Sequence, residues 1–313
     1  MTSIGQGALH RNTTASNNLA IGVGTGQYIT TGASNVCIGN SAGDAITTSV
    51  SNVIIGVGAG SAISTGSGEN VLIGNNAATA ATTAVGNIII GDNSAAGAAL
   101  TGSTNVFIGD NVAYNVTGAC DGNVVVGARA GGGLTTGDNC IFVGLEAGIT
   151  GSPGGNITTA NNTMVLGDEN VSASHVQTDW TVASDERDKT DFTALDIGLD
   201  FVNDLNPLTF KWDKRSKYID KQDPDVDLNT VTHDGTHKED WLDLGFKAQD
   251  VEKLEKAAGY KISDKTNLTT SLSMDGKQYS MKYTKFVPIL VKAVQELSAK
   301  NIALEARMKI LEG

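Results

Sequence analysis

Apolar residues in the first half of the chain recur in short clusters that lie 17 or 18 residues apart. Each cluster is an asparagine, an apolar stretch that usually ends in Ile-Gly, and a turn of small residues, as in NVCIGNSAG and NVIIGVGAG. The glycines that end the apolar stretches are Gly5, Gly22, Gly39, Gly56, Gly74, Gly91, Gly109, Gly127 and Gly144, with Gly167 following after 23 residues. A fixed period of this length indicates a repeat architecture.

Each repeat holds one short β-branched strand and a Gly/Ala turn, which is too little to bury its own apolar face. The repeats must therefore stack, and ten strands spaced by about 4.8 Å would form a rod of roughly 45 Å. We predict that residues 1–170 form an all-β shaft, either a β-roll or an intertwined trimeric β-structure, and that residues 171–183 are a linker. The first repeat begins at Ile4-Gly5, so we expect either a longer fibre or a capping or virion-attachment protein at this end.

The end of the chain has a helical period. Apolar residues and one asparagine alternate by three and four along the segment 286–313, at Val287, Leu290, Val294, Leu297, Asn301, Leu304, Met308 and Leu311. These are the a and d positions of a coiled coil, and Lys300 and Arg307 at g would face Glu305 and Glu312 at e of a parallel neighbour. The seam alone does not decide between a dimer and a trimer. The alternative is one amphipathic helix that packs on its own domain.

The segment 184–285 predicts an α+β domain. FVNDLNPLTFKWD is typical of a short helix, a proline turn and a strand that places Phe210 and Trp212 on one face. WLDLGFKAQDVEKLEKAAGY indicates a strand followed by a helix, and KQYSMKYTKFVPILVKAVQEL indicates a strand that leads into the C-terminal helix, with Pro288 in its first turn.

Composition places the boundary between shaft and domain at Ser184. The first 183 residues hold ten of the 34 acidic side chains and two of the 22 basic ones, and 32 of the 38 glycines. A net charge of −12, with so few bases in the shaft, argues against nucleic acid and against an anionic membrane surface. We see no signal peptide and no apolar run long enough to span a bilayer, so no membrane insertion is expected.

The other candidates for chemistry have simple structural explanations. Three cysteines form neither a disulfide framework nor a CxxC metal site, and we interpret them as free apolar side chains. DPDVDLNTVTHD, from Asp223, lacks the glycine and glutamate of a calcium loop, and His233 and His237 flank a glycine, so both segments are interpreted as solvated loops. Few aromatic residues of the shaft are candidates for an exposed sugar platform beyond Tyr28, Tyr114 and Phe107. No metal and no cofactor is expected.

Four motifs of the C-terminal region resemble one family, the intramolecular chaperone and auto-processing domain (peptidase S74) of phage tail fibres and tailspikes. They are SDERDK, LNPLTFKWD, LGFKAQDVEKL and the final helix YTKFVPILVKAVQELSAKNIALE, in this order, over nearly all of residues 184–313. The glycine-rich repeats also look like those that precede this domain in many tail fibres. SDERDK alone would favour a helix N-cap at Ser184; the other three motifs reverse that preference.

The resemblance implies a homotrimer whose C-terminal domain folds first, registers three chains and then cuts itself off. Ser184 would be the nucleophile of a single-turnover cut between Ala183 and Ser184, and Lys189, the lysine of the family motif, would be the general base. A lysine can accept the serine proton only when burial or nearby positive charge lowers its pKa. Asp185, which also matches the motif, would hold the turn or orient Lys189.

These inferences predict a tail-fibre protein of the virion, made in the host cytoplasm, with a host surface receptor as partner. The receptor site would lie in the longer turn LEAGITGSPGGNITTANN, where the period breaks. The alternative is a cell-surface trimeric adhesin-like β-repeat protein whose C-terminal domain trimerises without cleavage, and it predicts a stable chain of 313 residues. A membrane-tethered regulator would need a transmembrane run after the chaperone, and the sequence has none.

Overall fold

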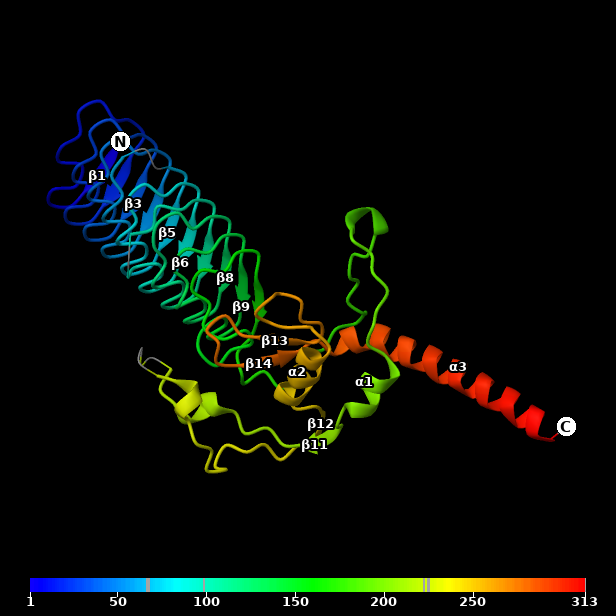
Figure 1. The fold of residues 1–313 in the computed structure, drawn as a ribbon. Helices are drawn as coiled ribbons and strands as arrows, with labels where there is room; N and C mark the ends of the chain where they lie inside the picture. Colours follow the sequence, from blue (N-terminus) through cyan, green and yellow to red (C-terminus); the bar gives the residue numbers. More distant parts are fainter. Residues whose placement is uncertain (66–67, 98, 222, 224–225, 313) are drawn as a thin grey trace. The chain divides into compact units, whose positions relative to one another are not determined.

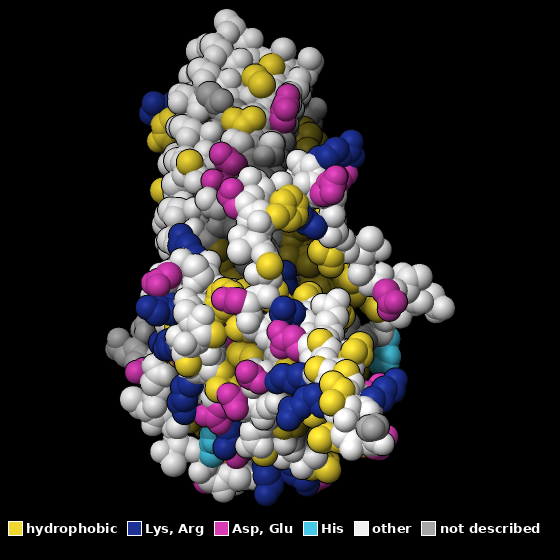
Figure 2. Space-filling model, turned by 45° about the vertical axis from the view of Figure 1, so that its right-hand side comes forward, with side chains coloured by type: hydrophobic (Ala, Val, Ile, Leu, Met, Phe, Trp, Pro, Cys, Tyr) yellow, Lys and Arg dark blue, Asp and Glu magenta, His cyan; other side chains and the backbone are white. Residues whose placement is uncertain are grey.

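The computed structural model describes residues 1–65, 68–97, 99–221, 223 and 226–312. The chain divides into two compact units, each with its own hydrophobic core. The shaft unit comprises Met1–Ser172 together with the later segment Ile219–Leu228, and the C-terminal unit comprises Ala173–Tyr218 and the chain from Asn229 onwards. Figure 2 shows a shaft surface with few dark-blue side chains, whereas Lys and Arg gather over the C-terminal unit.

In the described part of the chain, ten parallel strands of three residues stack in chain order to form the shaft (Figure 1). They are β1 (Thr2–Ile4), β2 (Leu19–Ile21), β3 (Val36–Ile38), β4 (Val53–Ile55), β5 (Val71–Ile73), β6 (Ile88–Ile90), β7 (Val106–Ile108), β8 (Val124–Val126), β9 (Ile141–Val143) and β10 (Met164–Leu166). Equivalent residues of successive repeats pair in register, so that Cys37 lies between Ala20 and Ile54. The predicted shaft of stacked repeats is confirmed, in the form of a parallel β-solenoid made by one chain.

The middle residue of each strand points into the solenoid, because successive side chains of a strand alternate between its two faces. From β2 onwards this residue is buried, while its two neighbours are partly or fully exposed. Phe107 is the middle residue of β7 and is completely buried, so its prediction as an exposed aromatic was wrong. Tyr28 and Tyr114 are exposed, and the Arg11 guanidinium lies 4.6 Å from the centre of the Tyr28 ring.

The three cysteines, Cys37, Cys120 and Cys140, are free and buried in the shaft core. Burial raises the pKa of the Cys37 thiol and that of the Cys120 thiol to about 12. Both therefore stay protonated at neutral pH and act as small apolar side chains, as the sequence predicted.

A ladder of asparagines runs through the interior of the shaft. Its members share the position before the strand and are buried; they are Asn18, Asn35, Asn52, Asn70, Asn87, Asn105 and Asn123. Each side-chain oxygen accepts a hydrogen bond from the backbone N–H at the equivalent position of the next repeat, for example Asn105 to Asn87 at 2.9 Å. The side-chain N–H groups donate across the coil, as from Asn87 to the Gly102 carbonyl at 3.0 Å. The asparagine of the repeat therefore satisfies backbone groups that the stacking buries.

The glycine after each strand turns the chain where successive coils touch. Gly91 has φ +142°, and a Cβ built on it would lie 2.0 Å from the carbonyl oxygen of Gly109 in the next coil. Only a residue without a side chain fits such a corner. This requirement explains why the glycine recurs with the period of the repeat.

The C-terminal unit is α+β, as predicted. Its helices are α1 (Leu199–Asp204), α2 (Ala248–Ala257) and α3 (Phe286–Glu312), and its antiparallel strand pairs are β11 (Leu208–Phe210) with β12 (Asp243–Gly245) and β13 (Thr270–Leu272) with β14 (Tyr279–Met281). Among the described residues, this unit also has the 3-10 turns η1 (Glu186–Asp188), η2 (Arg215–Tyr218) and η4 (Tyr283–Lys285), while η3 (Leu228–Thr230) begins at the last residue of the shaft-unit segment Ile219–Leu228. The rings of Phe210 and Trp212 meet edge to face at 5.2 Å.

The core of the C-terminal unit joins the helices. Phe201 from α1, Val251 from α2, and Phe286 and Ile289 from α3 are buried together. Glu255 of α2 is buried as well, and its carboxylate accepts hydrogen bonds from the backbone and side chain of Thr269 and from the side chain of Thr270. No helix in the described part of the chain is long and apolar enough to cross a membrane.

Candidate functional site

Ser184 and Lys189 lie on either side of η1, a single turn of 3-10 helix. The turn folds the chain back, so that Lys189 Nζ lies 2.6 Å from Ser184 Oγ and 3.0 Å from the Ser184 carbonyl oxygen. A separation of five residues across one tight turn is enough to join the two side chains. The motif SDERDK thus builds a serine–lysine pair from local sequence alone, within hydrogen-bonding distance for proton transfer.

Asp185 and Arg187 hold this turn. The Asp185 carboxylate accepts a hydrogen bond from the Arg187 backbone N–H at 3.0 Å and from its guanidinium Nη2 at 2.6 Å. These bonds lower the pKa of the Asp185 carboxyl. The N-cap that SDERDK also suggested is present, but at Asp185 of a 3-10 turn, so the Ser184 hydroxyl is not used as a cap.

The pair lies in an exposed stretch of chain. All residues from 171 to 194 are exposed, including the peptide bond between Ala183 and Ser184. Three large apolar side chains of this stretch are uncovered, with exposed fractions of 68% for Trp180, 81% for Val182 and 73% for Phe192. Burial is one way to favour a neutral lysine, and this stretch of the single chain does not supply it.

The predicted seam lies on one long helix, α3, of 27 residues. Phe286, Ile289 and Ala293 form the buried side of α3, whereas the seven apolar seam residues are all exposed and Asn301 is exposed too. From residue 297 to 312 every side chain is exposed. The start of α3 therefore packs on its own domain, as the alternative required, but the seam faces away from that core.

One group of carboxylates lies outside the serine–lysine pair. In the described part of the chain, the only cluster with the spacing of metal ligands is formed by Glu146, Asp168 and Glu169, whose oxygens lie within 4.8 Å of one another. Lys221 inserts its ammonium into this cluster. The sequence offered no signal for this contact, because Lys221 lies within a charged segment that has no period.

The loop predictions hold only in part. His233 and His237 are exposed and lie beside the Tyr218 ring, at 5.9 and 4.7 Å between ring centres. Residues 224 and 225 of DPDVDLNTVTHD lie outside the described residues, but Leu228 of this motif is completely buried. A fully solvated loop is therefore wrong for Leu228, because the segment Ile219–Leu228 belongs to the shaft unit.

The segment that begins at the serine–lysine pair matches a known protein family. Residues 184–260 match the model of the family Peptidase_S74, described as chaperone of endosialidase. The family in general has serine-type autoproteolytic activity. The match supports the interpretation of this segment as the intramolecular chaperone domain of a phage tail protein. No curated protein and no solved structure matches the chain.

Proposed function

We propose that this chain is a homotrimeric phage tail-fibre protein whose C-terminal chaperone registers three copies and then cuts its own chain once, between Ala183 and Ser184. The observation that supports this most strongly is the 2.6 Å contact between Lys189 Nζ and Ser184 Oγ at the first residue of the matched family segment. The change of composition from shaft to domain falls at the same residue.

The chemistry of the cut follows from the positions of these atoms. Neutral Lys189 takes the Ser184 hydroxyl proton, and Oγ attacks the Ala183 carbonyl carbon through a five-membered ring. The C–N bond then breaks as Lys189 returns the proton to the Ser184 nitrogen, which leaves an ester between Ala183 and Ser184 Oγ. Water hydrolyses the ester, giving the Ala183 carboxylate and a Ser184 with a free amine and hydroxyl. No further co-reactant is needed.

Exposure of the pair supports a cut that waits for assembly. In water a lysine stays protonated at neutral pH and cannot act as a base, so the site needs a cover that removes water from Lys189. Trp180, Val182 and Phe192 are apolar, exposed and close in sequence to the cleaved bond. Neighbouring chains packed against them would exclude water and favour the neutral lysine. Premature cleavage would otherwise break the covalent link between chaperone and shaft before the shafts are registered.

Two exposed apolar surfaces support the trimer. One is the seam of α3, where Val294 and Leu304 are 65% and 53% exposed. The other is the outer face of the shaft sheet, where the first and third residues of β2 to β10 are all uncharged and apolar. Large exposed apolar patches mark interaction surfaces. Because the cut separates the seam from the shaft, the shaft needs contacts of its own, and its sheet face offers them.

We place the fibre in the virion tail and propose a host surface receptor as its partner. The turn that follows β9, named above for that receptor, is mostly buried: Ser152 and Ile157 lie in its interior, and Pro153 and Gly154 are exposed. The exposed Tyr28 and Tyr114 offer further candidate contacts. Loss of host binding on deletion of residues 150–160, with the shaft still folded, would support the turn; unchanged binding would reject it.

Substitution of the pair tests the proposed cut. On a denaturing gel of freshly expressed protein we expect two fragments from the wild type, and an intact chain from Ser184→Ala and from Lys189→Ala. Lys189→Arg is expected to stay intact too, since a guanidinium does not give up its proton near neutral pH. Lys211→Ala, at an exposed lysine elsewhere in the domain, is the matched control and should cut normally. Cleavage of Ser184→Ala at the same bond would reject the nucleophile.

A further inference from the structure

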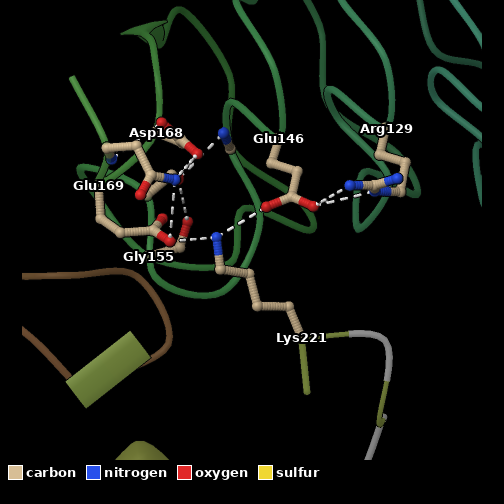
Figure 3. A network of polar contacts seen from close by, with 9 residues as sticks. Arg129, Glu146, Gly155, Asp168, Glu169 and Lys221 are labelled. Carbon is tan, nitrogen blue, oxygen red and sulfur yellow. Dashed lines mark hydrogen bonds and ion pairs between the residues drawn. The ribbon is translucent and has the colours of Figure 1, made fainter. Parts of the chain in front are cut away.

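Lys221 is a lysine of the C-terminal sequence whose side chain lies in the shaft unit. Figure 3 shows it reaching between Glu146, in the turn after β9, and Glu169, just after β10. Its ammonium lies 2.7 Å from Glu146 Oε2 and pairs with Glu169 Oε1. On the other side of Glu146, the guanidinium Nε of Arg129 donates to Oε1 at 2.9 Å. Two carboxylates and two cations therefore alternate along one network.

The side chains of Lys221, Glu146 and Glu169 are largely buried. Side-chain exposure is 12% for Lys221 and for Glu146, and 6% for Glu169. Burial opposes charge at Glu146, but hydrogen bonds and charge from Lys221 and Arg129 outweigh it and lower the pKa of the carboxyl. Burial likewise opposes charge at Lys221, and the two glutamates raise its pKa. Without Lys221, Glu146 would keep Arg129 as its cation, while the neighbouring buried Glu169 would lose its ammonium partner, which is strongly unfavourable.

The cut proposed above would place the two sides of this network on different fragments. Arg129, Glu146 and Glu169 precede Ser184, whereas Lys221 follows it. The residues that bind Lys221 come from the last two repeats of the shaft, the ones nearest to the cleaved bond in sequence. A broken peptide bond at Ser184 therefore leaves an ion network that still joins the fragments.

We propose that Glu146 and Glu169 form an acidic socket for Lys221, and that this socket keeps the cut chaperone bound to the shaft. The inference rests on the proposed function for the cut, but the contact itself does not depend on it. The occupant is a named segment of the same chain, Ile219–Leu228, whose Leu228 is also completely buried. Buried ion pairs are screened weakly by salt, so retention should persist at about 0.15 M NaCl.

The experiment tests retention by the socket independently of self-cleavage. A site for an added protease replaces residues 173–178, which are all exposed, in a chain that carries Ser184→Ala and a tag on the shaft. After the protease cuts, the shaft is immobilised at about 0.15 M NaCl, and release of the C-terminal fragment is followed over time. The variants are Lys221→Met, Lys221→Arg and, on the shaft side, Glu169→Gln. Lys211→Met, at an exposed lysine, is the matched control.

We expect the unsubstituted fragment to stay bound, and Lys221→Met to be released at least about 100-fold faster, because one partner of a buried pair is lost. Glu169→Gln should speed release too, whereas Lys221→Arg and Lys211→Met should retain the fragment. Equal release rates for Lys221→Met and Lys211→Met would overturn the socket, and so would immediate release of the unsubstituted fragment. Glu169→Gln judges the socket from the other fragment if Lys221→Met fails to fold.

The wild-type chain without the added protease site runs beside these variants on a denaturing gel. An uncut wild type would reject the proposed self-cleavage, while the protease-cut arm would still decide whether the socket holds the fragment. Wild type that cuts itself and then releases its chaperone at once would overturn the socket and leave the cut standing.

Discussion

The asparagine ladder makes a quantitative prediction for the shaft. Asn87 lies in its middle and is completely buried. Its oxygen accepts from the backbone and side-chain N–H groups of Asn105, both at 2.9 Å, and its own N–H groups donate to Gly102 at 3.0 Å and to Asn70 at 3.3 Å. Asn87→Ala removes these four bonds and leaves the buried N–H of Asn105 without its acceptor.

The expected loss of stability is large for the substitution of one buried side chain. A hydrogen bond contributes about 0.5–1.5 kcal/mol net, and a buried polar group left unpaired costs about 1–3 kcal/mol. We therefore expect Asn87→Ala to lower the free energy of unfolding by about 3–5 kcal/mol. Asn115→Ala is the matched control, because this exposed side chain donates one bond, to the Gly132 carbonyl at 2.7 Å. It should cost less than about 1 kcal/mol.

Urea titration followed by far-UV circular dichroism measures both variants, in a chain that carries Ser184→Ala and so stays intact. Coupling between adjacent repeats should make the loss appear as a shift of the whole shaft transition. A free energy of unfolding for Asn87→Ala within about 1 kcal/mol of that for Asn115→Ala would refute the ladder as a source of stability.

Three further predictions concern the corners, the seam and pH. Gly91→Ala should lower the free energy of unfolding of the shaft by at least about 2 kcal/mol. Gly118→Ala, which has open space around the added Cβ, should lower it less, and thermal melting of both variants measures the difference. Leu297→Asp with Leu304→Asp buries charge in the seam at several kcal/mol per chain, so the protein should be monomeric by light scattering and uncut; monomers that cut at the wild-type rate would reject gating. Because folding lowers the pKa of the Glu146 carboxyl, its contribution to stability is complete above the unfolded pKa and is lost as the pH falls through the folded pKa. The melting temperature should therefore decrease when the pH is lowered below about 4, and it should decrease less in Glu146→Gln.

Much of the fold was predictable because its signals are local and repeated. The strands, the corner glycines and the chain-order stacking all follow from one period, and the turn that joins Ser184 to Lys189 spans only five residues. The prediction of Phe107 as an exposed aromatic was wrong because the middle residue of β7 points into the core of the shaft. The residues at the equivalent position of the adjacent repeats, Ile89 and Val125, are buried in the same column.

The rest depends on contacts that leave no local pattern. Lys221 meets Glu146 across 75 residues of sequence, and one lysine among many charged residues does not announce a buried partner. The strand β13 was missed because TSL is short and polar, and its pairing with β14 depends on the packing around Glu255. Long-range pairing of this kind is set by tertiary structure and not by propensity.

The mass of the purified wild-type protein under denaturing conditions tests the central claim most directly. We predict two polypeptides, residues 1–183 and residues 184–313, the second beginning with the free amine of Ser184, and a single chain of 32.3 kDa for Ser184→Ala. A wild type that stays at 32.3 kDa, or one that is cut at another bond, would contradict it.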